Sequence, residues 1–253
     1  MKAATDTFVL FRRPFVQQLR NPSYIFANVS TSIMYLVLFL PLLKKLTGPG
    51  FGSGEVIQIF LPGVIAYLFL TTGMYSVWAT IFELKKGLIE RLRVTPASRF
   101  ALLMGPILMW VAWTLISATI LVVVSIPFGF EVHIAGLLLF AVLLVMLLIV
   151  GAAWSTALTI LMKAEIIGIS AVVTGLNLPL LLTGGVMLPL SLAPGWMRAL
   201  AHANPLYYAV EAGRDLATGA ISTDAVALAF AIITPLTVLV ITWAMRVYRK
   251  AVA

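Results

Sequence analysis

Charged side chains are most closely spaced between two long apolar stretches, from Glu83 to Arg99. Leu84, Leu88 and Leu92 recur every four residues in this segment, so a helix here would carry one narrow apolar stripe flanked by charges. Pro96 would end that helix. The segment is too polar to cross a membrane, and an apolar ridge among mixed charges suits docking into the groove of a cytoplasmic partner. The alternative is a solvated loop that anchors the inner leaflet of a membrane.

The sequence shows none of the common catalytic arrangements. It has no Cys, and its two histidines, His133 and His202, are isolated, so thiolate chemistry and a metal-ligand cluster are both excluded. It also lacks a GxxxxGK(S/T) phosphate loop, an HExxH motif and a Ser/His/Asp set inside an apolar stretch. We therefore expect no catalytic residue, no metal site and no cofactor in this chain, and we expect it not to be an enzyme.

The polar side chains inside the long apolar stretches are hydroxyls and a few amides, such as Thr71, Ser117 and Asn177. They could contact a greasy substrate, but coupling to a proton or ion gradient needs ionisable groups or coordinating clusters at membrane depth. If the protein moves a substrate uphill, we expect the energy to come from a separate motor that docks on the charged segment.

Composition indicates which elements must position these residues. Of 253 residues, 62% are apolar and only 10% are charged, which argues against an ordinary soluble domain. Six charge-free runs exceed twenty residues, and a helix needs roughly 20 apolar residues to cross a membrane. The long runs do not alternate as the strands of an outer-membrane barrel would. The sequence therefore predicts an all-α integral membrane protein with six spans, at 23–43, 57–82, 100–127, 133–162, 166–186 and 224–246.

The orientation of these spans follows from the basic residues. The side of the membrane that holds both termini carries 13 of the 17 basic residues with four acidic ones, net +9, and the other side carries four basic and five acidic residues, net −1. The positive-inside rule then predicts two cytoplasmic termini. The formal net charge of +8 reflects topology and attraction to membrane lipids of the inner leaflet, so we expect no nucleic-acid partner.

A further helix is expected over residues 5–20, before the first span. Its apolar side chains recur at helical spacing, which is typical of an amphipathic helix in the inner membrane interface. The residues assigned to it are Phe8, Phe11, Arg12, Phe15 and Leu19.

The fifth charge-free run, 166–197, is too long for one crossing and is interrupted by Pro179, Gly184-Gly185 and Pro189. We expect one span at 166–186 and then a segment at 187–222 formed by two short helices that dip into the outer leaflet. Within it, Glu211 and Arg214 are three residues apart and are expected to pair and stabilise a short helix. A stripe of small residues in the fifth span indicates either a close helix contact, such as a dimer face, or helix flexibility.

Short sequence pieces punctuate the spans in a specific order. They are Arg20-Asn21-Pro22, Phe60-Leu61-Pro62-Gly63, the segment Gly87 to Arg99, Gly184-Gly185-Val186-Met187-Leu188-Pro189, Pro194-Gly195-Trp196, and the segment Asn204 to Arg214. Together they resemble, over nearly the whole chain, the membrane subunit of bacterial ABC exporters of the second exporter class, particularly the daunorubicin/doxorubicin-resistance permease branch. The resemblance implies a single permease domain over residues 1–253, with an N-terminal interfacial helix, a coupling helix at 83–97 and re-entrant outer helices between spans five and six.

The resemblance also implies partners and site residues. Two permeases, as a homodimer or as a pair, would be clamped by two ATP-binding-cassette subunits that hold the ATP and Mg. The residues expected to receive the conformational change of the ATPase are Glu83, Lys85, Lys86, Leu88, Glu90, Arg91, Leu92 and Arg93. The N-terminal helix would rest against the same subunit, and the Lys163–Glu165 turn would be a second, smaller contact.

A substrate path is expected between the two permease copies, lined by spans one, two and five. The candidate residues are Met34, Tyr67, Thr71, Asn177 and Thr183. The expected function is export of hydrophobic or amphipathic, drug- or antibiotic-like compounds out of the cytoplasm or inner leaflet, across the cytoplasmic membrane of a bacterium. The alternatives are export of a lipid or lipid-linked polysaccharide, and a membrane assembly factor that transports nothing.

Overall fold

The computed structural model describes residues 2–20, 30, 34, 53–85, 99–186, 190 and 193–252. These residues form helices joined by turns and short irregular segments, and no strand occurs among them. In chain order the elements are α1 (Lys2–Leu19), α3 (Ser53–Tyr75), α4 (Val77–Lys85), α6 (Arg99–Ser125), the 3-10 helix η1 (Ile126–Phe128), α7 (Ile134–Leu161), α8 (Ile166–Thr183), α9 (Gly195–Ala201), α10 (Pro205–Ala217) and α11 (Asp224–Val252). The expected all-helical class is confirmed for this part of the chain.

Five segments of the described chain are long and apolar enough to cross a membrane. They are Ile57–Phe82, which joins α3 and α4, Leu103–Phe128, Ile134–Leu161, Ile166–Thr183 and Asp224–Lys250. Each overlaps one of the six stretches expected to span the membrane. The remaining stretch, 23–43, lies outside the described residues except for Ser30 and Met34, so the sixth span stays a prediction.

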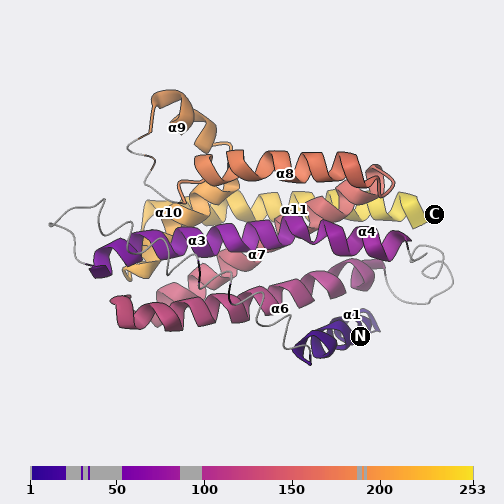
Figure 1. Cartoon of the computed structure of the whole chain (residues 1–253), viewed down its shortest axis with the longest axis horizontal. Coiled ribbons are helices and arrows are strands. Elements are labelled where there is room, and N and C mark those ends of the chain that lie inside the picture. Colours follow the sequence, from indigo (N-terminus) through magenta and orange to yellow (C-terminus); the bar gives the residue numbers. More distant parts are fainter. Residues whose placement is uncertain are drawn as a thin grey trace.

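The long helices run side by side in alternating directions (Figure 1). As a result, the end of α4, the start of α6, the α7–α8 turn and the end of α11 gather at one end of the molecule, which we call the basic end. The short helices α9 and α10 lie at the opposite end, beside the start of α3 (Figure 1). This arrangement separates the segments expected to face the cytoplasm from those expected on the outer side.

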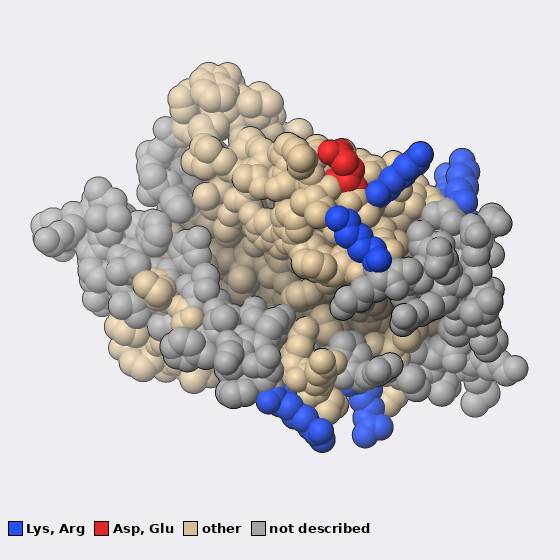
Figure 2. All heavy atoms as spheres, turned by 45° about the vertical axis from the view of Figure 1, so that its right-hand side comes forward, with Lys and Arg blue, Asp and Glu red and all other residues tan. Residues whose placement is uncertain are grey.

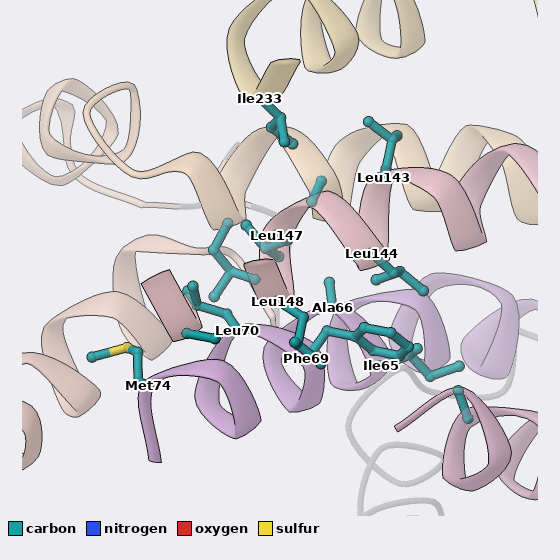
Figure 3. Close-up of a cluster of buried hydrophobic side chains, with 14 of the residues drawn as sticks. Ile65, Ala66, Phe69, Leu70, Met74, Leu143, Leu144, Leu147, Leu148 and Ile233 are labelled. Atoms are coloured by element: carbon teal, nitrogen blue, oxygen red, sulfur yellow. The ribbon is translucent and has the colours of Figure 1, made fainter. Parts of the chain in front are cut away.

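Helix α7 forms the centre of the packed core. It is apolar all round, as expected for a helix that other helices surround, and it packs against α3, α10 and α11. Figure 3 shows Leu147 and Leu148 of α7 between Phe69 of α3 and Ile233 of α11, and all four side chains are fully buried. Since lipid is as apolar as these side chains, close packing rather than water exclusion holds such helices together within a membrane.

Two glycines allow α3 and α7 to approach at backbone distance. A Cβ atom added to Gly73 would meet the carbonyl oxygen of Leu148, and one added to Gly151 would lie 2.8 Å from the carbonyl oxygen of Leu70. One turn further along α7, the hydroxyls of Ser155 and Ser76 are 2.9 Å apart. Small residues with interhelical hydroxyl contacts are a common basis for close helix pairs in membranes.

The second candidate span is locally irregular where it packs against α7. Ser76 separates α3 from α4, and its hydroxyl donates to the carbonyl oxygen of Gly73 at 2.7 Å. Helical hydrogen bonds still run through this point, because the Ser76 N–H donates to the carbonyl oxygen of Thr72 at 3.1 Å and the Thr80 N–H donates to that of Ser76 at 3.2 Å. A hydroxyl that bonds back to its own helix bends the helix locally. Helices α3 and α4 therefore form one span with an irregular turn at Ser76.

Candidate functional site

A polar bridge links α3 and α8 within the apolar part of the molecule. The Tyr67 hydroxyl donates to Oδ1 of Asn177 at 2.6 Å, and Nδ2 of Asn177 donates to the Tyr75 hydroxyl at 3.1 Å. Tyr67 and Tyr75 are eight residues apart, so both lie on one face of α3. Tyr67 and Asn177 were two of the residues expected along a substrate path, and the structure brings them into direct contact.

The other path candidates lie differently. Thr71 is buried and its hydroxyl donates to the carbonyl oxygen of Tyr67 in its own helix, 2.7 Å away. Thr183 donates to the carbonyl oxygen of Pro179 at 2.7 Å and accepts from Nδ2 of Asn204 at 2.9 Å, so it joins α8 to the N-terminus of α10. Met34 is exposed in this chain, and its position relative to the path stays a prediction.

Most of α8 is uncovered. Only Ile169 and Val173 of this helix are buried, and in its most apolar 18-residue window 11% of the residues are buried, against 67% for the span formed by α3 and α4. The exposed side chains include Leu178 and Leu182, which are four residues apart and therefore lie on one face of α8 next to the polar bridge. The face of α8 beside Asn177 is therefore open to a lipid, a cargo molecule or another chain.

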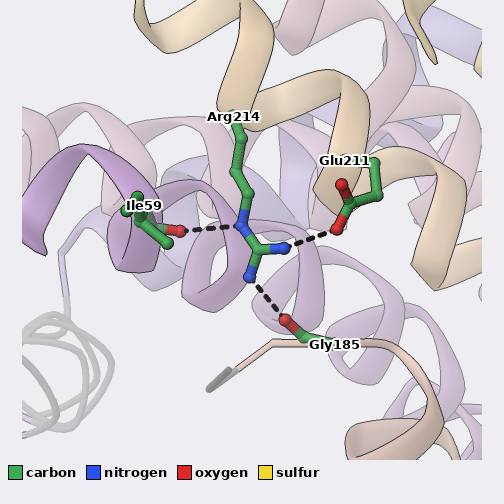
Figure 4. Close-up of polar contacts among 4 residues, drawn as sticks. All are labelled: Ile59, Gly185, Glu211 and Arg214. Carbon is green, nitrogen blue, oxygen red and sulfur yellow. Dashed lines mark hydrogen bonds and ion pairs between the residues drawn. The ribbon is translucent and has the colours of Figure 1, made fainter. Parts of the chain in front are cut away.

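Arg214 locks the opposite end, where α10 meets α3 and the turn after α8 (Figure 4). Its Nη1 donates to Oε1 of Glu211 at 2.5 Å, which confirms the expected pair. In addition, Nη2 donates to the carbonyl oxygen of Gly185 at 2.6 Å and Nε donates to that of Ile59 at 3.1 Å. Burial lowers the pKa of the Arg214 guanidinium and Glu211 opposes that shift, so the side chain remains a cation.

Other contacts fix α10 against α7. A Cβ atom added to Gly136 would meet the carbonyl oxygen of Leu216, so the two helices touch at backbone distance. Nδ1 of His133 lies 2.9 Å from the carbonyl oxygen of Ala217. One of the two isolated histidines thus has a structural partner. The two short helices lie in the stretch where re-entrant helices were expected, and their depth in a membrane stays a prediction.

The basic end carries most of the exposed positive charge. Figure 2 turns this end toward the viewer and shows Lys and Arg side chains gathered around it. The exposed basic residues on its helix ends and turns are Lys85, Lys163, Arg246, Arg249 and Lys250. The opposite end carries the acidic residues Glu131, Glu211, Asp215 and Asp224. The distribution agrees in sign with the orientation that the charge count favours.

The segment expected to couple to an ATPase begins at this end. Glu83 and Lys85 are in the last turn of α4, and Lys85 is exposed. The other six coupling candidates, Lys86, Leu88, Glu90, Arg91, Leu92 and Arg93, lie outside the described residues. The nearby α7–α8 turn is tight, because Lys163 and Ala164 both have positive φ, 50° and 56°, and both Lys163 and Glu165 are exposed. Non-glycine residues rarely adopt this conformation.

Helix α1 packs along the first half of α6. The ring centroids of Phe15 and Trp113 are 5.6 Å apart, and a Cβ atom added to Gly105 would lie 2.7 Å from Cβ of Leu10. Trp113 is ten residues beyond Leu103, the start of that candidate span, which is about 15 Å along the helix. Of the expected interfacial residues, Phe11 and Phe15 are half-buried, and Phe8, Arg12 and Leu19 are exposed. Placement of α1 at the membrane surface stays a prediction.

The family follows from comparison of the whole sequence. The model of the ABC-2 type transporter family matches residues 5–217. The chain belongs to this family. The match includes the polar bridge, the Arg214 lock and the charged segment, so these three features lie within the ABC-2 region.

Named relatives of this ABC-2 permease are transport permeases. It is 28% identical over 215 residues to the putative transport permease ycf38 of Cyanophora paradoxa, covering 83% of this chain and 73% of that protein. It is 25% identical over 222 residues to the daunorubicin resistance ABC transporter permease protein DrrB1 of Streptomyces coeruleorubidus, covering 86% and 78%. It is 28% identical over 206 residues to the inner membrane transport permease YadH of Escherichia coli strain K12, covering 81% and 77%.

These matches support a coarse assignment. The chain is a multi-pass membrane permease of an ABC transporter, and membership of the ABC-2 family implies pairing with an ATP-binding-cassette ATPase. The resemblance to the daunorubicin-resistance branch, seen first in short sequence pieces, is confirmed at the level of the family and of one named relative.

Proposed function

We propose that this ABC-2 permease exports hydrophobic or amphipathic, drug- or antibiotic-like compounds from the cytoplasm or inner leaflet across a bacterial cytoplasmic membrane. It works as one of two permeases, in a homodimer or a pair, with two ATPase subunits that bind ATP and Mg. The observation that carries the proposal is the uncharged polar bridge between α3 and α8, which lies on an otherwise apolar and uncovered helix face.

The path runs beside α8. Because so little of α8 is buried within one chain, its open face is available to the second permease, and the space between the copies forms a path with apolar walls. Tyr67 and Asn177 lie on the edge of that face. An apolar path with hydroxyl and amide groups suits amphipathic cargo better than ions, which need charged or coordinating groups.

The energy enters at the basic end. Four of the five candidate spans contain no Lys, Arg, Asp or Glu, and the fifth, Asp224–Lys250, carries charges only near its two ends, which leaves an ion gradient without a binding group at membrane depth. The ATPase docks on the coupling helix at 83–97, with the exposed Lys163–Glu165 turn as the second contact. Movement of the docked subunit pulls on α4, which continues into α3 through the irregular turn at Ser76.

Docking is tested by purification. The permease is co-expressed with its ATP-binding-cassette subunit, and the variant with Glu83, Arg91 and Arg93 replaced by Ala is expected to lose the ATPase. The matched control replaces Glu131 and Arg198 by Ala, which are exposed on the opposite end and should leave the complex intact. An unchanged complex in the triple variant contradicts the docking site.

Cargo class is tested in the same preparation. Stimulation of ATP hydrolysis by daunomycinone, the uncharged aglycone of daunorubicin, supports drug export. Stimulation by phospholipid or lipid-linked glycan, with indifference to daunomycinone, supports the lipid-export alternative. A complex that binds the ATPase but moves no cargo supports the assembly-factor alternative.

A further inference from the structure

Asn177 has hydrogen-bonding capacity that the chain uses only in part. An Asn side chain offers two N–H donors and two acceptor lone pairs on its oxygen. Among the described residues its amide makes two hydrogen bonds, one from Tyr67 and one to Tyr75. Within that part of the chain, one donor and one lone pair of the amide remain open. The Tyr75 hydroxyl accepts from Asn177 and therefore still has its own hydrogen to donate.

These open positions lie at membrane depth. Asn177 is 11 residues beyond Ile166, the start of α8, which is about 17 Å along the helix and close to the middle of a hydrocarbon core of about 30 Å. Water is scarce at that depth, and a polar group without a partner is disfavoured there. A ligand that supplies the missing partners is thereby favoured over a lipid tail that cannot.

The open positions are also accessible. Tyr75 is 40% exposed, and Leu176 and Leu178, the neighbours of Asn177 along α8, are 40% and 60% exposed. Polar atoms of Asn177 and Tyr75 thus border an apolar surface that a greasy molecule can cover. A molecule with an apolar body and one polar group matches both parts of this surface.

We propose that Tyr75 and Asn177 form a binding site for uncharged amphiphiles that carry a hydroxyl group. The ligand hydroxyl donates to the open lone pair of Asn177 Oδ1 and accepts from the Tyr75 hydroxyl, while its apolar body lies over the exposed side chain of Leu178. The inference rests on the proposed export function and assigns to it a class of cargo. It also adds Tyr75 to the residues that select cargo.

The absence of charged residues in the sequence around the site restricts the ligands of this site to uncharged molecules. Residues 56–82 and 166–197 include no Lys, Arg, Asp or Glu. A charged group brought to Asn177 would lose its hydration without gaining an opposite charge from these spans. Selection therefore rests on hydrogen bonds.

The test compares two probes that differ only in whether the terminal oxygen carries a hydrogen or a methyl group. The permease–ATPase complex in lipid nanodiscs is titrated with 1-pyrenedecanol and with its methyl ether, and binding is followed by energy transfer from tryptophan to pyrene. The ether can accept a hydrogen bond but cannot donate one. Because one hydrogen bond contributes about 1 kcal/mol, the alcohol is expected to bind about fivefold more tightly. Equal binding, or no saturable binding of either probe, overturns the inference.

Three variants test which side-chain atoms cause the tighter binding of the alcohol. Asn177→Leu removes the acceptor, so the alcohol and the ether should bind equally. Tyr75→Phe removes the hydroxyl that donates to the ligand oxygen and accepts from Asn177 Nδ2, but it keeps the Oδ1 acceptor, so both probes should weaken about fivefold and their ratio should persist. Thr119→Val is the control, because Thr119 is exposed on another helix, α6, where its hydroxyl donates to the carbonyl oxygen of Leu115, and neither affinity should change. A preference that survives Asn177→Leu, or that Thr119→Val abolishes, contradicts the site.

The outcomes separate this inference from the proposed function. Each variant is measured only in complex with the ATPase, and Tyr75→Phe retains the aromatic ring, so it gives a reading even where Asn177→Leu fails to assemble. In that case an unchanged affinity of both probes in Tyr75→Phe overturns the site. An intact, ATP-hydrolysing complex without a preference for the alcohol contradicts the inference alone, whereas failure to bind any ATPase contradicts the proposed function.

Discussion

Single residues hold this permease together mainly through backbone groups of their neighbours. Arg214 makes two of its three contacts with carbonyl oxygens, of Ile59 and Gly185, and thereby joins α10, α3 and the turn after α8. Gly73 and Gly151 likewise act by letting two backbones meet. Carbonyl partners carry no side-chain signature, so the sequence predicts the Glu211–Arg214 pair but not the wider lock.

Replacing Arg214 separates these contributions. Arg214→Lys keeps the charge but cannot reach two carbonyls and a carboxylate with one ammonium group, so we expect a loss of about 2–3 kcal/mol of stability. Glu211→Gln should cost less than about 1 kcal/mol, because that carboxylate is partly exposed. Thermal unfolding of the detergent-solubilised protein measures both. Equal losses in the two variants would show that the ion pair, not the carbonyl contacts, dominates.

Gly151→Ala tests the α3–α7 contact. The new methyl group would lie 2.8 Å from the carbonyl oxygen of Leu70, so the helices must move apart, at a cost of about 1–3 kcal/mol. Gly175→Ala is the control, because a Cβ atom there would meet nothing within 4 Å, and it should be neutral or slightly stabilising. Unfolding midpoints that are the same for both variants contradict the contact.

At the scale of helices, the sequence predicts where spans lie better than which faces meet. Burying a charge in lipid is costly, so long runs without charge indicate spans. Five of the six such runs overlap a candidate span in the described part of the chain. Tyr67 and Asn177 could be chosen as polar residues in apolar runs. Tyr75 was missed, although its spacing of eight from Tyr67 places both on one face, because nothing in the sequence of α3 identifies α8 as the partner. The irregular turn at Ser76, between α3 and α4, was also not predicted, because a single Ser in an apolar run does not mark an irregularity of the helix.

The open face of α8 can be tested by cross-linking. The chain has no native Cys, so Leu178→Cys introduces a single thiol on this face. If two copies meet there, mild oxidation of membranes should give a disulfide-linked dimer. Leu138→Cys on α7 is the control, because Leu138 is as exposed as Leu178, 65% against 60%, but lies on another helix. A dimer formed equally by both variants, or by neither, contradicts the assignment of α8 to the interface.

At the scale of the whole molecule, the charged groups and the uncharged polar groups lie in different parts of the structure. The basic end exposes Lys85 and the Lys163–Glu165 turn, the middle holds the uncharged bridge, and the Arg214 lock lies at the other end. This division matches a permease that receives its energy from a partner and handles cargo without charge. The ABC-2 family match over residues 5–217 supports the same division between permease and ATPase.

The most direct test is ATP-driven movement of cargo by the complete complex. Inside-out vesicles that contain the permease and its ATPase subunit are expected to accumulate daunomycinone, the uncharged aglycone of daunorubicin, when ATP and Mg are added outside. Vesicles with either subunit alone, or with the permease that carries Ala in place of Glu83, Arg91 and Arg93, should not. Accumulation that does not depend on ATP, or that persists without the ATPase subunit, would contradict the account of this chain as the permease of an ATP-driven exporter.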